Sequence, residues 1–132
     1  MRNQNLSSDI LLITFSEDLY KFHYALSMAS TLRATERKVT VFITGYSCNY
    51  IRKEWEKYDI NNIREKLKRS KMPTIKQLFL YCKELNVKFY YCSTALDYLE
   101  INISEITNFV DIDTAGLYSV INDHKDKKII FI

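Results

Sequence analysis

Residues 72–101 constrain the fold more than any other stretch, because helix signals and strand signals alternate within them. Pro73 suits the first turn of a helix, where its missing N–H has no partner to lose. Residues 74–77 have the sequence of a capping box, although Ser70 is an alternative cap. Apolar side chains then recur at helical spacing as far as Leu85, with polar ones between them. The sequence therefore predicts an amphipathic helix that begins at the capping box.

Asn86 follows that helix, and asparagine tolerates the left-handed conformation that ends many helices. Residues 87–92 are rich in β-branched and aromatic side chains, so they predict a short strand that ends at Cys92. Ser93 or Thr94 can cap a second helix, which places the sulfur of Cys92 beside the positive end of that helix. A thiol in that position is expected to have a lowered pKa, and the thiolate is its reactive form.

The rest of the chain continues the alternation of strands and helices. Further strands are predicted at residues 9–15, 38–44, 110–112 and 127–132, and the last is apolar enough to be buried or paired. Helices are predicted after Ser16 as a cap, within residues 47–70 with a break at 59–62, after Ser104 as a cap, and at 114–122. The pattern predicts an α/β fold in one domain, residues 1–132: a three-layer α/β/α sandwich with a mainly parallel five-stranded sheet.

Three cysteines without a CxxC pair argue against a disulfide framework and against a structural zinc site. The carboxyl ends of parallel strands share one edge of a sheet, where ligands bind in open α/β folds. Gly45, Tyr46 and Cys48 follow the second strand, so they are expected at the same edge as Cys92. Cys48 either faces Cys92 or fills apolar space, whereas Cys82 lies on the apolar helix face and is expected in the core.

The sequence lacks a glycine-rich phosphate loop, an HExxH motif and a GxSxG motif, so we expect neither a cofactor nor a metal. The net charge of +3 comes from residues 52–71, where eight Lys or Arg accompany four acidic residues and favour a solvated helix face over a nucleic-acid site. Apolar runs such as residues 10–15 are too short to span a bilayer, and residues 1–9 lack the apolar core of a signal peptide. We therefore expect a cytoplasmic protein with no integral membrane segment and no nucleic-acid partner.

Several of these features together resemble the DsrE/DsrF-like family, and in particular its DsrE2-type branch. That branch has a recurring segment of the form MPS, a helix, ELGV, a strand, and C-x4-D-x2-GI. The matching residues in this chain are Met72-Pro73-Thr74, the helix to Leu85, Asn86-Val87-Lys88-Phe89, and Cys92 followed by Asp97 and Ile101. The resemblance spans nearly the whole chain, because it continues at Ser16-Glu17-Asp18, Val41-Phe42-Ile43-Thr44 and Ile130-Phe131-Ile132.

The resemblance implies a homo-oligomer, either a trimer or a hexamer, that acts in cytoplasmic sulfur relay. In the family, a cysteine at the position of Cys92 is the candidate carrier of a persulfide, exchanged with TusA-like sulfur carriers or rhodanese-type proteins. Backbone N–H groups of Ser93, Thr94 and Ala95 would then form an anion hole for the charged sulfur. Glu100 stands where the family has a glycine, which implies strain or a different exit from the helix.

Three functions remain open on these grounds. The first is a sulfur carrier or sulfurtransferase that uses Cys92, with Cys48 assisting or resolving. The second is a non-catalytic, oligomeric binding module. The third is a thiol redox protein in which Cys48 and Cys92 form a reversible disulfide, which requires their Cα atoms to lie within roughly 7 Å. Trp55 is expected either in the core or at an oligomer contact.

Overall fold

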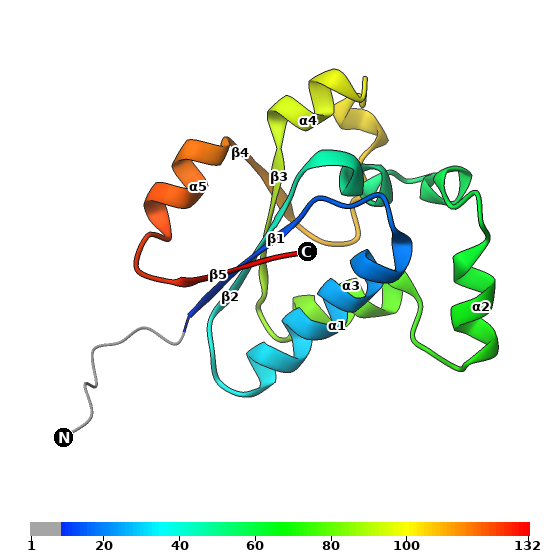
Figure 1. Ribbon diagram of the computed structural model, residues 1–132, viewed down its shortest axis with the longest axis horizontal. Coiled ribbons are helices and arrows are strands. Elements are labelled where there is room, and N and C mark those ends of the chain that lie inside the picture. The colour runs from blue at the N-terminus through cyan, green and yellow to red at the C-terminus, as the bar shows by residue number, and fades with distance from the viewer. Residues whose placement is uncertain (1–8) are drawn as a thin grey trace.

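A computed structural model describes residues 9–132 and contains a five-stranded, all-parallel sheet in the order β4-β3-β2-β1-β5 (Figure 1). The strands are β1 (Ile10–Thr14), β2 (Val39–Ile43), β3 (Lys88–Cys92), β4 (Ile112–Ala115) and β5 (Lys128–Phe131). The helices are α1 (Leu19–Ala34), α2 (Ile63–Arg69), α3 (Ile75–Glu84), α4 (Ser93–Tyr98) and α5 (Leu117–Asp123). Three 3-10 helices complete the fold: η1 (Gly45–Ile51), η2 (Trp55–Tyr58) and η3 (Ile103–Glu105).

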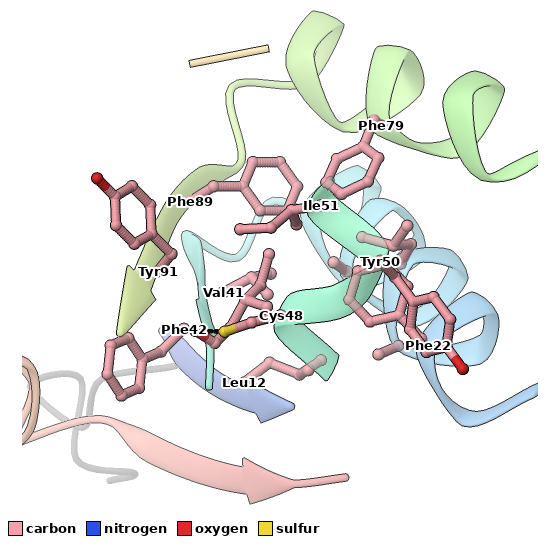
Figure 2. Close-up of a cluster of buried hydrophobic side chains, with 14 of the residues drawn as sticks. Leu12, Phe22, Val41, Phe42, Cys48, Tyr50, Ile51, Phe79, Phe89 and Tyr91 are labelled. Carbon is pink, nitrogen blue, oxygen red and sulfur yellow. Dashed lines mark hydrogen bonds between the residues drawn. The ribbon is translucent and has the colours of Figure 1, made fainter. Parts of the chain in front are cut away.

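The main core lies between the sheet and the helices α1 and α3. Parallel register puts Leu12, Val41 and Phe89 side by side on one face of the sheet. Phe79 of α3 meets Phe89 with ring centroids 5.2 Å apart, and Phe22 of α1 meets Phe79 at 6.0 Å (Figure 2). Burying each of these side chains removes apolar surface from water and favours folding by about 1.5–3 kcal/mol. The apolar runs of the central strands are therefore explained by burial on both faces.

The opposite face of the sheet is covered by α5, which gives the three predicted layers (Figure 1). Thr40 alternates with Val41 along β2, and its hydroxyl oxygen lies 3.3 Å from Nε2 of His124 at the end of α5. Nδ1 of the same ring donates to the carbonyl of Val120 at 2.7 Å. The predicted α/β/α sandwich with five strands is thus confirmed, and every strand pair is parallel.

The thin cover on that face leaves apolar side chains at the surface. β5 is an edge strand, paired with β1 on one side. The expectation that this strand is either buried or paired is met by its pairing with β1, and several of its side chains stay exposed. The exposed large hydrophobic side chains on β5 and the first turn of α5 are Ile129 (48% exposed), Phe131 (67%), Leu117 (58%) and Tyr118 (80%).

Both predicted ends of α3 are confirmed by their hydrogen bonds, and α4 ends in the same way. Thr74 and Gln77 form the predicted capping box, with bonds of 3.0 and 2.8 Å. Asn86 has a φ of 63°, and Glu100 has a φ of 56°. At each of these two ends the next residue bonds back across the last turn, as in a Schellman motif, so both residues occupy the left-handed position that glycine normally fills.

Several predicted boundaries are wrong. The cap of α1 is Asp18, whose carboxylate accepts from the N–H of Tyr20 at 2.8 Å, while Ser16 only accepts from the N–H of Asp18. Asn102, and not Ser104, caps the turn now seen as η3, which is shorter than predicted. β4 begins at Ile112, where the predicted strand 110–112 ends, and pairs with β3 as far as Ala115. α5 therefore begins at Leu117, later than the helix predicted at 114–122.

No helix within residues 9–132 combines the length and apolar character that a membrane span requires. The expectation about a signal peptide falls largely on residues 1–8, which lie outside the described residues.

Candidate functional site

Cys92 lies at the carboxyl end of β3, where the strand passes directly into α4. The residue pairs with Ala115 of β4 and keeps an extended conformation, with φ of −82° and ψ of 116°. It therefore occupies the N-cap position of α4 itself. The prediction that Ser93 or Thr94 caps this helix is wrong, since both belong to its first turn, are exposed, and no side chain caps α4.

Cys48 lies beside Cys92, because η1 follows β2 and β2 is the neighbour of β3. Its thiol is fully buried and donates to the carbonyl of Ile43 at 3.4 Å (Figure 2). The pKa of Cys48 is raised to about 12, mainly by burial and also by negative charge on Cys92, while a backbone hydrogen bond from Cys92 and the charge of Arg52 oppose the rise. Cys48 is thus a protonated thiol at neutral pH.

Two tyrosines share this edge of the sheet with the cysteines. Partial desolvation raises the pKa of Tyr98, and negative charge on Cys48, Cys92 and Tyr46 adds to the increase. The four side chains are therefore close enough to interact electrostatically. Tyr98 is 54% exposed and Tyr46 is 47% exposed, so both phenols face solvent. Sequence analysis missed Tyr98, although it ends the short helix that starts at Cys92.

The other residues predicted at this edge occupy different environments. Ala95 is buried against the core, whereas Asp97 is exposed on α4. Gly45 has a φ of +55°, and a Cβ added there would lie 2.4 Å from the ring of Phe15. Gly45 is therefore required by backbone conformation and by close packing, so its place in the site is structural.

Thr14 and Ser47 form a buried hydroxyl pair that sequence analysis did not identify. Their oxygens are 2.8 Å apart, and Ser47 Oγ also lies 2.7 Å from the carbonyl of Thr44, to which it donates. Both side chains are 1% exposed. The pair joins the end of β1 to the loop after β2, and this loop carries Cys48.

Arg52 anchors the end of η1 to the segment that follows α4. It donates to Asn49 at 3.0 Å, to the carboxylate of Glu105 at 3.2 Å and to the carbonyl of Leu99 at 3.2 Å. Its guanidinium also stacks 4.4 Å from the ring centroid of Tyr58. The prediction of a solvated, charged face over residues 52–71 is wrong for Arg52, which is only 8% exposed. It connects the elements that carry Cys48 and Cys92.

The three cysteines differ in exposure, and all are free thiols. Cys92 is 7% exposed, whereas Cys48 and Cys82 are completely buried. Cys82 donates to the carbonyl of Leu26 at 3.6 Å within the core, as predicted, and burial raises its pKa to about 12. Within residues 9–132, no group of three or more His, Cys, Asp or Glu side chains could hold a metal ion. The chemistry available at this edge is therefore that of a thiol with polar neighbours.

Solved structures with the same fold span almost the whole chain. The protein MTH1491 from Methanobacterium thermoautotrophicum, described as of unknown function, has a TM-score of 0.64 and 13% identity, and the match covers 96% of this chain and 100% of that one. The ychN protein from E. coli has a TM-score of 0.64 and 16% identity, over 95% of this chain and 99% of that one. No functionally curated protein matches the chain. Residues 13–130 match the sequence model of the DsrE/DsrF-like family, and the chain therefore belongs to that family.

Proposed function

We propose that this protein is a sulfur-relay protein that carries sulfane sulfur as a persulfide on Cys92. One observation carries the proposal: Cys92 stands at the carboxyl end of a central parallel strand, and of the three thiols it alone has accessible surface. Membership of the DsrE/DsrF-like family supports the same role, because the family is usually associated with sulfur relay.

The proposed transfer needs no cofactor and no oxidant. The thiolate of Cys92 attacks the outer sulfur of a donor persulfide, so a new S–S bond forms as the S–S bond of the donor breaks. The donor leaves as a thiolate, and the proton released from Cys92 passes to solvent or to that leaving group. α4 has no side-chain cap, so the N–H groups of Ser93, Thr94 and Ala95 are proposed to stabilise the charged sulfur.

Cys48 assists this chemistry in its protonated form. A pKa of about 12 leaves very little thiolate at neutral pH, so Cys48 is a poor nucleophile there. This disfavours a redox cycle in which Cys48 attacks a modified Cys92. The single S–H of Cys48 already donates to the carbonyl of Ile43, so the proposed contribution of this buried side chain is to exclude water from the persulfide on Cys92.

The second candidate function is a non-catalytic binding module, and the small exposure of Cys92 favours it. A side chain that is 7% exposed admits a donor only if neighbouring side chains move. In a binding module, the exposed Tyr46 and Tyr98 would contact the ligand or the partner, while Cys92 would only pack.

Further properties of the proposed relay protein follow from the family. We propose that the chain belongs to the DsrE2-type branch, works in the cytoplasm as a single domain, and forms a homotrimer or homohexamer. The exposed apolar side chains of β5 and α5 support self-association, because such surfaces are rarely left to water. The proposed partners are a TusA-like sulfur carrier and a rhodanese-type protein.

Mass spectrometry of the intact protein tests the proposal. The wild type and the variants Cys92→Ser, Cys48→Ser and Cys82→Ser are incubated with a cysteine desulfurase and cysteine. We expect a reducible adduct of one sulfur atom on all forms except Cys92→Ser. If the adduct persists in Cys92→Ser, or forms on no variant, the protein is not a Cys92 persulfide carrier. Partner binding that is unchanged by Cys92→Ser would then support the binding module.

A further inference from the structure

A cavity with a volume of about 440 Å³ lies on the α1 and α3 side of the molecule, and none of the three cysteines lines it. Its walls come from the first turns of α1 and α3, from η2 and from α2. The volume falls within the roughly 300–1,000 Å³ typical of sites for small molecules.

The outer wall, α2, is held in place by its two ends and has no fully buried side chain. At its start, the carboxylate of Asp59 accepts from the N–H groups of Ile63 (2.8 Å) and Arg64 (3.0 Å), and pairs with the Arg64 side chain at 2.9 Å. At its end, Lys71 has a φ of 60°, and the N–H of Met72 donates to the carbonyl of Leu67 at 3.0 Å. Local hydrogen bonds therefore fix both ends of α2, while Ile63 at its start packs against the core, and α2 forms one wall of the cavity.

The inner wall is also fixed before any ligand arrives. Nε2 of His23 lies 2.8 Å from the carbonyl oxygen of Pro73 and must donate to it, since a carbonyl can only accept. This bond joins α1 to Pro73, which precedes the cap residue of α3. The capping box of Thr74 then holds the first turn of α3, and Ile75 is buried directly behind it. A preformed wall lowers the entropy cost of binding.

The lining combines an apolar surface with an excess of positive charge. Its apolar side chains are Leu19, Trp55, Leu67, Met72, Ile75 and Phe109. Five cationic residues line the cavity, against the two carboxylates Glu56 and Glu65. Arg52 and Arg64 are paired with Glu105 and Asp59, but Lys53, Lys68 and Lys76 enter no ion pair within residues 9–132.

We propose that this cavity binds a small molecule with an apolar, ring-sized body and one anionic group, such as an aryl carboxylate or sulfonate. The body contacts Trp55, Leu67 and Phe109, and the anion lies near Lys68 and Lys76. Lys76 is already oriented toward this site, since its ammonium lies 5.4 Å from the ring centroid of Phe109. The site is separate from the proposed persulfide carrier and does not depend on it.

Two matched probes test the proposal on the full-length protein by calorimetry. 1-Anilinonaphthalene-8-sulfonate has the aromatic body with an anion, and N-phenyl-1-naphthylamine has the same body without it. We expect one site per chain and binding of the sulfonate about ten-fold tighter than that of the neutral probe, since charge-assisted contacts from two lysines are worth roughly one factor of ten. Equal affinities, or no saturable binding, would overturn the proposal.

Charge-reversal variants locate the site. Lys68→Glu combined with Lys76→Glu should weaken sulfonate binding at least ten-fold and leave the neutral probe nearly unchanged. Lys66→Glu combined with Lys83→Glu makes the same change in net charge on exposed positions of the same two helices outside the cavity, so it should bind like the wild type. An equal loss in both double variants would mean that the probe responds only to the overall charge.

Nuclear magnetic resonance gives a readout that does not rely on substitution. The chain has a single tryptophan, so Trp55 contributes the only indole N–H resonance. That resonance and the amide of Leu67 should shift as the sulfonate is added. Shifts confined to Phe131 and Tyr118, on the exposed apolar surface of β5 and α5, would place the probe elsewhere and refute the assignment.

Discussion

The edge that carries the cysteines and the α2 segment are held together in different ways. At the cysteine edge, contacts join residues far apart in the chain, as between Thr14 and Ser47 or between Arg52 and Glu105. At α2, the main bonds link residues at most five positions apart, around Asp59 and Lys71. A change at the cysteine edge should therefore alter global stability, whereas a change at α2 should loosen that segment alone.

The largest effect is expected for Arg52→Met. The variant loses three hydrogen bonds and leaves the carbonyl of Leu99 and the side chain of Asn49 without their donors. We expect a loss of about 2–3 kcal/mol in the free energy of unfolding, because the guanidinium is buried and charge-assisted bonds are strong. Urea denaturation measures it, with the exposed Arg69→Met as the control. A loss no larger than that of the control would show that the cysteine edge is not held by Arg52.

Gly45→Ala should cost about 2 kcal/mol, from the positive φ and from the approach of the new Cβ to Phe15. Adding Phe15→Leu should restore the stability that Gly45→Ala loses through the steric clash, but not the stability that it loses through the positive φ. Thermal denaturation of the two single variants and the double variant separates the two causes. If Phe15→Leu recovers nothing, the close approach plays no part in the cost.

The buried thiol of Cys48 should make stability fall in alkaline solution. Its pKa in the folded protein is about 12, against the usual 9.0. Between these values the unfolded chain releases the proton and the folded chain keeps it, so the stabilisation present below pH 9 is lost as pH rises toward 12. Cys48→Ala should flatten this part of the pH profile of urea denaturation. An unchanged slope would mean that Cys48 titrates normally.

Asp59→Asn should act on α2 alone. The amide keeps one acceptor but loses the charge that pairs with Arg64 and favours the start of the helix, a change of about 1 kcal/mol. Hydrogen exchange should accelerate at the amides of α2, while β1 to β3 keep their protection. Faster exchange throughout the sheet would contradict the view that α2 is an independently held segment.

The smallest effects come from two matched substitutions at left-handed positions. Glycine adopts a positive φ without the strain that a side chain causes. Glu100→Gly and Lys71→Gly should therefore each stabilise the end of the helix concerned by about 0.5–1 kcal/mol. Glu100 lies at the cysteine edge, and its substitution should raise the global free energy of unfolding. Lys71 lies at α2, and its substitution should appear only in hydrogen exchange of that helix. Equal global effects would remove the distinction between the two regions.

Features that depend on neighbours along the chain could be predicted from the amino-acid sequence. The strand before Cys92, the capping box at Thr74 and the left-handed end at Asn86 were all predictable, because local side chains and backbone bonds decide them. The errors at Ser16, Ser93 and Ser104 have a related cause. Near Ser16 and Ser104 a second polar residue, Asp18 or Asn102, can also serve as the cap, whereas α4 begins directly after Cys92 and has no side-chain cap.

Contacts between residues far apart in the chain, in contrast, depend on how the strands and helices pack. The sequence placed Cys48 and Cys92 at the same edge of the sheet, but the pairing of β2 with β3, which makes the two cysteines neighbours, and the approach of Tyr98 to them follow from no spacing in the sequence. The burial of Arg52 was equally hidden, since its partners Leu99 and Glu105 lie about fifty positions away. The hydrophobic periodicity of the sequence indicates which side chains are buried, whereas the residues that each one contacts depend on strand order and helix packing.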